Sequence, residues 1–327
     1  MKLKKEVLIL IVAIAVLLLY LTLRSTNRNE IQLPQPAQLE KNAISRLVLT
    51  GKQNAPLELV KKDARWFIEP HGYPVDNVKV NNMLHSISEL RLTALVSESG
   101  NYDRYGLGAG EKIAVQAFRG DSALRVFSIG KPAPTHQHTF VLMDGDSRVY
   151  HARGQLERTF EQSVESLRDK TIFDFDKDSI TALTLEKKGK KLEVSKIDIA
   201  PQQSVPESEQ QEESPVHAPN TEWQADGGRK VDQKSVERLL EEIDHLVCDA
   251  FLEDDAGKTL KDPLWRITFK RAEEEVGFAV YPKMNESADQ LPLTASTTPY
   301  AFLLQETRLD NIEKHLNTLM GIEAKKN

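Results

Sequence analysis

The hydrophobic pattern of the chain begins with an apolar run at residues 7–23, in which only Tyr20 and Thr22 are polar. In a helix this run rises about 26 Å, which is near the lower limit for spanning a hydrocarbon core of about 30 Å. Three lysines precede the run, and this charge bias favours a cytoplasmic N-terminus. We therefore predict an uncleaved signal anchor in residues 1–28: a single-pass helix in the inner (cytoplasmic) membrane, with the body of the chain in the periplasm or another extracytoplasmic space.

Two other interpretations of the run stay open, a cleaved signal peptide and a buried core helix. Cleavage needs small residues just beyond the apolar run, whereas the only Ala-x-Ala lies inside it, at residues 13–15. The sole cysteine is Cys248, so a lipid anchor on a cysteine after the run is excluded. A single cysteine cannot form an intramolecular disulfide, which is compatible with an oxidising compartment.

Two polar stretches follow the anchor. Residues 29–43 include Pro34 and Pro36 and predict a short tether. Residues 198–220 contain four prolines, many Glu and Gln residues and no apolar periodicity. Such a stretch cannot bury enough surface to offset its ordering entropy, so we expect a disordered acidic loop.

The remaining sequence contains an internal repeat. Residues 75–94 match residues 231–250 at a constant offset, and Trp66 and Trp223 occupy equivalent places before them. In both copies apolar residues recur at spacings of four, three and three, which is typical of one helix face. An aspartate stands at the expected N-cap of each helix (Asp76 and Asp232).

The repeat predicts two tandem modules, at residues 44–178 and 179–322, with a short tail at 323–327 and the acidic loop interrupting the second module. Alternating segments at residues 113–129 and 141–151 predict β-hairpins. Each module closes with an amphipathic segment, at 156–167 and 309–319, which predicts a helix. Strands followed by helices favour an α+β class, with a mostly antiparallel sheet-plus-helix module in each copy.

Charge adds one exclusion to this picture. The chain has a net charge of −6, and residues 1–28 carry five basic residues and one acidic residue, which leaves −10 for the rest. A net acidic body gives no basic footprint for nucleic acid or anionic lipid, so we expect no nucleic-acid partner.

Two segments superficially match ligand-binding loops. Residues 106–112 are rich in glycine, but Glu111 separates the last glycine from Lys112 and no Ser or Thr follows, so we expect a turn instead of a phosphate loop. Three alternating aspartates at 174, 176 and 178 match the start of a calcium loop. That loop needs a glycine and a glutamate further on, where this chain has Ser179 and Leu185, so we expect a solvated linker.

The histidines offer a possible metal site. His136 and His138 alternate, so on a strand they would face one side, with Asp144, Asp146 and His151 close in sequence. Two imidazoles and a carboxylate could hold zinc with an open position. The simpler interpretation is a polar strand end followed by turn chemistry, and we assign no metal and no cofactor.

No catalytic arrangement is evident. Cys248 aligns with the apolar Leu92 in the repeat, and we expect it to be a small buried hydrophobic residue. The two equivalent tryptophans are expected in the module cores. The chain contains no G-x-S-x-G motif, so no catalytic residue is assigned.

Several of these segments together resemble an uncharacterised bacterial family, catalogued as domain of unknown function 4340. The resemblance rests on the N-terminal anchor and on three short motifs, which are Arg65-Trp66-Phe67-Ile68, Tyr105-Gly106-Leu107 and Leu167-Arg168-Asp169-Lys170 before Phe173-Asp174. It implies an exported, membrane-tethered protein that is often encoded beside ABC transporters and gliding-motility-type components. It implies no catalytic residues.

We therefore expect a non-enzymatic, membrane-anchored accessory or scaffold subunit of an ABC-type transport system, with membrane-protein subunits as partners. The alternative is an ectodomain that binds a peptide or a glycan. A metal-assisted hydrolase using His136 and His138 is a third hypothesis. The oligomeric state does not follow from the sequence.

Overall fold

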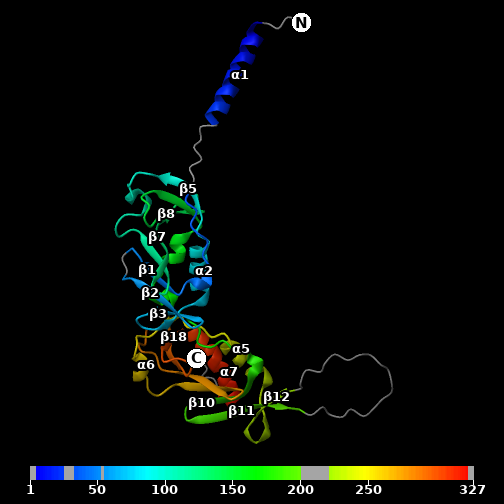
Figure 1. The fold of residues 1–327 in the computed structure, drawn as a ribbon. Coiled ribbons are helices and arrows are strands. Elements are labelled where there is room, and N and C mark those ends of the chain that lie inside the picture. Colours follow the sequence, from blue (N-terminus) through cyan, green and yellow to red (C-terminus); the bar gives the residue numbers. More distant parts are fainter. Residues whose placement is uncertain (1–4, 26–32, 53–54, 200–220, 323–327) are drawn as a thin grey trace, which may run out of the picture. The chain divides into compact units, whose positions relative to one another are not determined.

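The computed structural model describes residues 5–25, 33–52, 55–199 and 221–322, and the chain divides into two compact units, Met1–Asp169 and Lys170–Asn327 (Figure 1). Each unit contains one nine-stranded sheet in which neighbouring strands run antiparallel. The class is mixed α+β, and the two similar sheets fit two tandem modules.

The first sheet has the strand order β4-β3-β2-β1-β6-β7-β8-β9-β5. Its strands are β1 (Arg46–Thr50), β2 (Leu57–Lys62), β3 (Arg65–Glu69), β4 (Tyr73–Pro74), β5 (Leu92–Ser97), β6 (Ile113–Arg119), β7 (Ser122–Pro132), β8 (His138–Met143) and β9 (Val149–Arg153). Its helices are α2 (Asn77–Ser88), α3 (Leu156–Phe160) and α4 (Val164–Leu167), with short 3₁₀ turns η1 (Lys41–Ala43) and η2 (Asp103–Tyr105).

The second sheet has the order β13-β12-β11-β10-β15-β16-β17-β18-β14, which repeats the first strand for strand. Its strands are β10 (Ile180–Lys187), β11 (Lys190–Asp198), β12 (Thr221–Ala225), β13 (Arg229–Lys230), β14 (Ala250–Phe251), β15 (Trp265–Arg271), β16 (Glu274–Val280), β17 (Gln290–Ala295) and β18 (Ala301–Gln305). Its helices are α5 (Gln233–Ile243), α6 (Ala256–Thr259) and α7 (Glu306–Met320), with 3₁₀ turns η3 (Lys177–Ser179) and η4 (Asp226–Gly228).

The repeated helices form where the apolar spacing predicts them. In α2 the carboxylate of Asp76 accepts hydrogen bonds from the backbone N–H groups of Val78 and Lys79, at 2.8 and 3.2 Å, which confirms the predicted N-cap. In α5 Asp232 holds the N-cap position, and its carboxylate accepts from Ser235 Oγ at 2.6 Å. Both helices end before the last apolar residue of the predicted stripe, but those two residues are still buried after the helix ends (Leu90 and Leu246).

The two closing segments differ between the units. In the second unit a continuous helix, α7, buries its apolar stripe beside α5 (Figure 1). In the first unit the predicted helix at 156–167 is split into α3 and α4, because Ser163 caps a new helical turn at that point. The predicted hairpins at 113–129 and 141–151 are present as β6–β7 and β8–β9.

Each sheet buries one set of alternating side chains in a core of its own. Trp66 and Trp223 are 4% and 6% exposed, which confirms the core positions expected from the repeat. In the first unit Phe127 of β7 meets Phe160 of α3 edge to face, with ring centroids 6.2 Å apart.

The boundary between the units lies after Asp169, nine residues before the expected one. The reason is the segment that follows, where Phe173 and Phe175 pack on Phe269 of β15 with ring centroids 5.1 and 4.7 Å apart. This segment is therefore part of the second core and is not a linker, although Asp174, Asp176 and Asp178 are solvent-exposed, as expected. Asp174 and Asp176 alternate with the buried phenylalanines because the chain is extended there.

The N-terminal run forms helix α1 (Lys5–Ser25), and its large apolar side chains between residues 9 and 21 are 50–68% exposed. Among the described residues, no helix is both long enough and apolar enough to cross a membrane. The transmembrane assignment of residues 7–23 therefore stays a prediction. Most of the acidic stretch, residues 200–220, lies outside the described residues, as do residues 26–32 of the anchor and tether and the tail at 323–327.

The second unit contains a buried lysine. Lys187 ends β10 on the core side and is 7% exposed. Its ammonium group pairs with Glu313 of α7 and donates to Asn317 Oδ1 at 2.6 Å. The interaction joins the end of the β10–β11 hairpin to the closing helix, so a buried charge here depends on two specific partners.

We expect Lys187→Met to lower the unfolding free energy of the second unit by about 1–3 kcal/mol, because Glu313 and Asn317 lose their donor. Urea unfolding followed by tryptophan fluorescence in a Trp66→Phe background measures this, since the other two tryptophans lie in the second unit. The matched control is Lys191→Met. The Lys191 side chain is 56% exposed and paired with Glu193, and we expect no measurable change, because an exposed ion pair contributes little to stability. Equal losses for the two variants would contradict this account.

Candidate functional site

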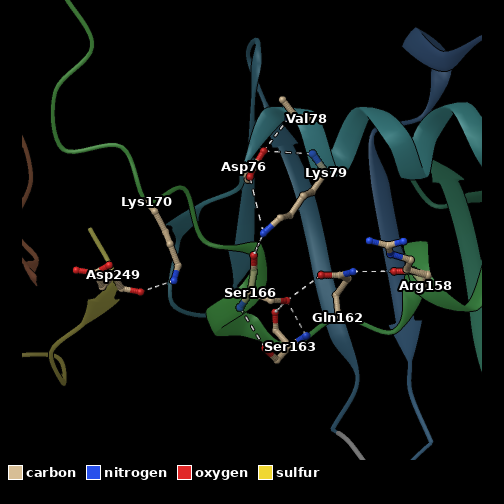
Figure 2. A network of polar contacts seen from close by, with 9 residues as sticks. All are labelled: Asp76, Val78, Lys79, Arg158, Gln162, Ser163, Ser166, Lys170 and Asp249. Carbon is tan, nitrogen blue, oxygen red and sulfur yellow. Dashed lines mark hydrogen bonds and ion pairs between the residues drawn. The ribbon is translucent and has the colours of Figure 1, made fainter. Parts of the chain in front are cut away.

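A network of polar contacts joins the start of α2 to the segment that closes the first unit (Figure 2). The backbone N–H of Asp76 donates to the Leu167 carbonyl at 2.8 Å. The ammonium group of Lys79, one turn into α2, donates to the Ser166 carbonyl and lies 3.8 Å from the Asp76 carboxylate. These bonds satisfy backbone groups at the start of α2 and at the end of α4, so their first effect is to stabilise the first unit.

The serines in Figure 2 have a similar role. Ser163 Oγ accepts from the Ser166 N–H at 3.1 Å, and Ser166 Oγ accepts from the Ser163 N–H at 3.0 Å, which is a reciprocal capping box. Ser166 Oγ also lies 2.8 Å from Gln162 Oε1, and the Gln162 amide donates to the Arg158 carbonyl. Neither hydroxyl meets an imidazole or an amine in these contacts, so the network lacks the base that would activate a serine nucleophile.

Lys170 and Asp249, also drawn in Figure 2, belong to the second unit. Lys170 Nζ donates to the Asp249 carbonyl at 2.5 Å, and the Cys248 N–H donates to the Lys170 carbonyl at 2.8 Å. These bonds fasten the first residues of the second unit beside the segment that follows α5.

The predicted histidine site is only partly assembled. His138 of β8 and His151 of β9 stack with ring centroids 5.6 Å apart, and Phe140 lies 4.9 Å from His151. His136 does not share a strand face with His138, because it lies before β8 in a turn and has a left-handed φ of 54°. Gln155 donates to its carbonyl instead.

The carboxylates expected beside the histidines lie at the other end of the hairpin. His138 pairs with Arg153 across β8 and β9, whereas Asp144 and Asp146 belong to the turn that joins the two strands. Within the described ranges no group of three or more His, Cys, Asp or Glu residues is placed to hold a metal ion. The zinc hypothesis therefore lacks its carboxylate ligand.

Asp146 is committed to an ionic contact in that turn. Arg148 Nη2 donates to it at 2.8 Å and the Tyr150 hydroxyl donates at 2.7 Å. The hydrogen bonds from Arg148 hold the pKa of the Asp146 carboxyl well below its ordinary value. Burial, together with the hydrogen bond to Asp146, raises the pKa of Tyr150 to about 12. Asp146 is thus a stable anion that organises the turn.

His151 lies in an apolar setting. Its Nε2 atom is buried and has no hydrogen-bond partner among the described residues. Burial, and secondarily the neighbouring His138, lower the pKa of the His151 imidazole. The repeat explains the setting: His151 lies opposite Phe140 of β8, just as Leu303 lies opposite Pro292 of β17, so the second unit has an aliphatic residue at the same place.

The glycine-rich segment at 106–112 begins with a tightly packed turn, as expected. Gly106 follows η2 with a φ of 65°, and a Cβ there would lie 3.0 Å from the Lys131 backbone nitrogen. A Cβ on Gly130 would lie 2.3 Å from the Tyr105 carbonyl oxygen. The turn lies so close to β7 that it buries Leu107 with Ala133, Phe140 and Val149 in a small second core.

Cys248 is 4% exposed and belongs to the main core of the second unit, which confirms its expected role as a buried hydrophobic residue. His245, the histidine nearest in sequence, follows the end of α5 and pairs with Asp174 at 2.8 Å. Its side chain is 75% exposed.

Comparison with known proteins gives one match. A family model described as "Domain of unknown function (DUF4340)" matches residues 66–263, which is more than half of the chain and includes parts of both units. No curated protein and no solved structure matches.

Replacing the capping aspartate tests the network of Figure 2. We expect Asp76→Ala to destabilise α2 by about 1 kcal/mol, and Asp76→Asn by less, because the amide oxygen still caps the helix. Hydrogen exchange of the α2 amides measures the change, with α5 in the same molecule as the internal control. Equal losses for the two substitutions would show that the cap is not the important contact.

The His151 environment predicts a pH dependence. As the pH falls below about 6.5, the unfolded chain binds a proton that the folded state resists, so the stability of the first unit decreases in that range. His151→Leu, which installs the residue of the second unit, removes this contribution. Hydrogen exchange of the β8 and β9 amides between pH 5 and 7.5 measures it, with the exposed His85→Leu as control. An unchanged slope in His151→Leu would refute the assignment.

Proposed function

The chain belongs to the DUF4340 family, and from that premise we propose that it is a non-enzymatic, membrane-anchored envelope protein whose duplicated body works by contact. We further propose that it is an accessory or scaffold subunit of an ABC-type transport system in the inner membrane. Its N-terminus would lie in the cytoplasm and both modules in the periplasm.

The observation that supports a membrane anchor is the exposure of the apolar side chains of α1. Its large apolar side chains between residues 9 and 21 are at least 50% exposed, and exposed apolar surface is unfavourable by about 25 cal/mol per Å² in water. A lipid environment removes that penalty. The lysines before the apolar run and the polar residues after it support insertion of this segment as a signal anchor.

The connection between the tether and the first unit supports a scaffold. Arg125 of β7 is buried, and its guanidinium donates to the carbonyls of Ile87 and Ser88 at the end of α2 and to the Ala37 carbonyl of the tether. A cation is favourable at a helix C-terminus. Arg125 therefore fastens the described part of the tether to the folded unit. Such a contact supports a scaffold, because the folded unit is then held at a defined position relative to the tether.

The structural roles of several reactive side chains support a protein that works by binding partners and not by catalysis. Asp146 is neutralised by Arg148, Asp76 caps a helix and Cys248 lies in a hydrophobic core. These three reactive groups therefore already have structural roles. Two repeated sheets supply a large and regular surface for protein partners.

Membrane fractionation tests the anchor. We expect the full-length chain to stay with the membrane through washes with high salt and alkaline carbonate, and to be released only by detergent. A double substitution that places arginine inside the apolar run (Val12→Arg and Leu17→Arg) should release the protein. Matching substitutions outside the run (Arg24→Gln and Arg28→Gln) should not. Release of the unaltered protein without detergent would refute the anchor.

Crosslinking in cells, followed by detergent purification and mass spectrometry, tests the partner. We expect reproducible recovery of the membrane subunits of one ABC transporter. A variant with an unrelated transmembrane helix in place of residues 7–23 separates contacts made by the body from contacts made by the anchor. Recovery of background proteins alone, with both versions, would contradict the accessory role.

A further inference from the structure

The outer face of the second sheet contains a groove, lined by both polar and apolar side chains, over three central strands, β15, β16 and β17. The groove has a volume of about 460 Å³. Its floor includes Gly277 and Ala279 of β16, both buried. A Cβ at position 277 would lie 2.4 Å from the Ile267 carbonyl oxygen, so only glycine fits there.

Hydroxyl groups surround this floor. Thr268 comes from β15, Thr294 from β17, and Tyr281 and Ser296 follow β16 and β17. Ser296 Oγ accepts from the Gly277 N–H at 2.9 Å, and the hydroxyls of Tyr281 and Thr294 lie 3.3 Å apart. These bonds orient the hydroxyls and still leave each one a further donor or acceptor position.

The matching face of the first unit is covered by the chain itself. Thr294 pairs with Ala279 in β16, and its counterpart Leu142 pairs with Ser128 in β7. Leu142 packs against the small core that contains Leu107. The same position is therefore apolar and covered in one copy, but polar and half-buried in the other, so the second sheet has a surface suited to a hydrophilic ligand.

One end of the groove is strongly basic. At Arg266 it adjoins a second hollow of about 340 Å³, which is lined by Lys187, Lys188, Lys190 and Lys191. Glu275 lines the groove and Glu186, 4.0 Å from Arg266, lines the hollow, so five cations stand against two carboxylates across the two linings. This concentration of cations lies in a body with an overall net charge of −10 after residue 28. The net charge of the whole chain hides this concentration, although the run Lys187-Lys188-Gly189-Lys190-Lys191 is visible in the sequence.

The lysines lie at a rigid turn. Lys188 and Gly189 are the two loop residues between β10 and β11, and both have positive φ angles, 50° and 72°, as a type I′ turn requires. Lys187 and Lys191 pair with Glu313 and Glu193. For Lys188 and Lys190 no ion pair occurs among the described residues, which leaves two cations at the mouth of the hollow for an anionic group.

The backbone of the groove narrows the choice of ligand. β15, β16 and β17 are interior strands, and their backbone groups already pair with neighbouring strands. A peptide therefore cannot bind here by adding a strand. Hydroxyls that both donate and accept suit the hydroxyl groups of a sugar, and lysines and arginine suit a carboxylate or a phosphate.

We propose that this groove binds an acidic saccharide, with the carboxylate or phosphate at the Lys188–Lys190 end and the sugar hydroxyls along Thr268, Thr294 and Ser296. The binding is a function of the second unit alone and goes beyond the proposed accessory role. Its test does not depend on whether the proposed membrane anchor or the proposed transporter partner is correct.

Isothermal titration of the detergent-purified full-length protein tests the proposal, with trigalacturonate and glucose 6-phosphate as probes. Maltotriose is the neutral saccharide control, pentaglutamate is the acidic peptide control, and inorganic phosphate is the simple anion control. We expect at least one acidic sugar to bind at least tenfold more tightly than all three controls. We also expect its affinity to fall as salt is raised, because part of the attraction is ionic.

The variants separate the two ends of the site. Lys188→Asn with Lys190→Gln removes two charges and keeps a residue that suits the turn, and we expect at least a tenfold loss of affinity. Thr294→Val removes one hydroxyl at nearly constant shape and should weaken the acidic sugar without affecting phosphate. Lys230→Gln with Lys258→Gln, two exposed lysines elsewhere in the unit, should change the affinity less than twofold.

Three results would overturn the proposal. One is the absence of binding by both acidic sugars in a protein whose thermal unfolding shows a folded second unit. Another is equal affinity for pentaglutamate or for inorganic phosphate, which would indicate a general anion site. The third is sugar binding that none of the groove variants weakens, which would place the site elsewhere.

Discussion

Each sheet must bury one face, and this requirement organises the rest of the structure. An antiparallel sheet can leave one face in water if the other face is covered by packed elements, which here are helices. In the first unit α2 and α3 contribute the cover, and in the second unit α5 and α7 do. The closing segments, the capped helix starts and the two tryptophan cores all follow from bringing those helices back onto the sheet.

Two buried cations connect the covering helices to other parts of their units. Arg125 joins the tether to the end of α2, and Lys187 joins a hairpin to α7. Burying such groups is unfavourable unless every donor is used. Both side chains meet two or more oxygen acceptors, so neither of these two cations is buried without partners. The Arg125 contact is not repeated in the second unit, because Val276 of β16 stands where Arg125 stands in β7.

The repeat also shows how two similar units acquire different surfaces. The first unit uses the turn at residues 102–107 to cover part of its outer sheet face and form a second small core. In the second unit the corresponding connection contains α6, which lies against Ala301 and leaves the groove at β15–β17 open. The two copies therefore differ both in the connecting segment and in the side chains of the outer face, Leu142 in the first unit and Thr294 in the second.

The sequence by itself determined the α+β class, the tandem repeat, the helix faces and the core positions of Trp66, Trp223 and Cys248. These follow from local periodicity and from comparison of the two copies. It did not determine the unit boundary, because the burial of Phe173 and Phe175 depends on contacts with the distant Phe269. Nor did it separate His138 from Asp146, since proximity in a hairpin depends on register rather than on sequence distance. The basic hollow beside the groove was decided by tertiary structure for the same reason, because Arg266 reaches the lysine hairpin only through the pairing of β15 with β10.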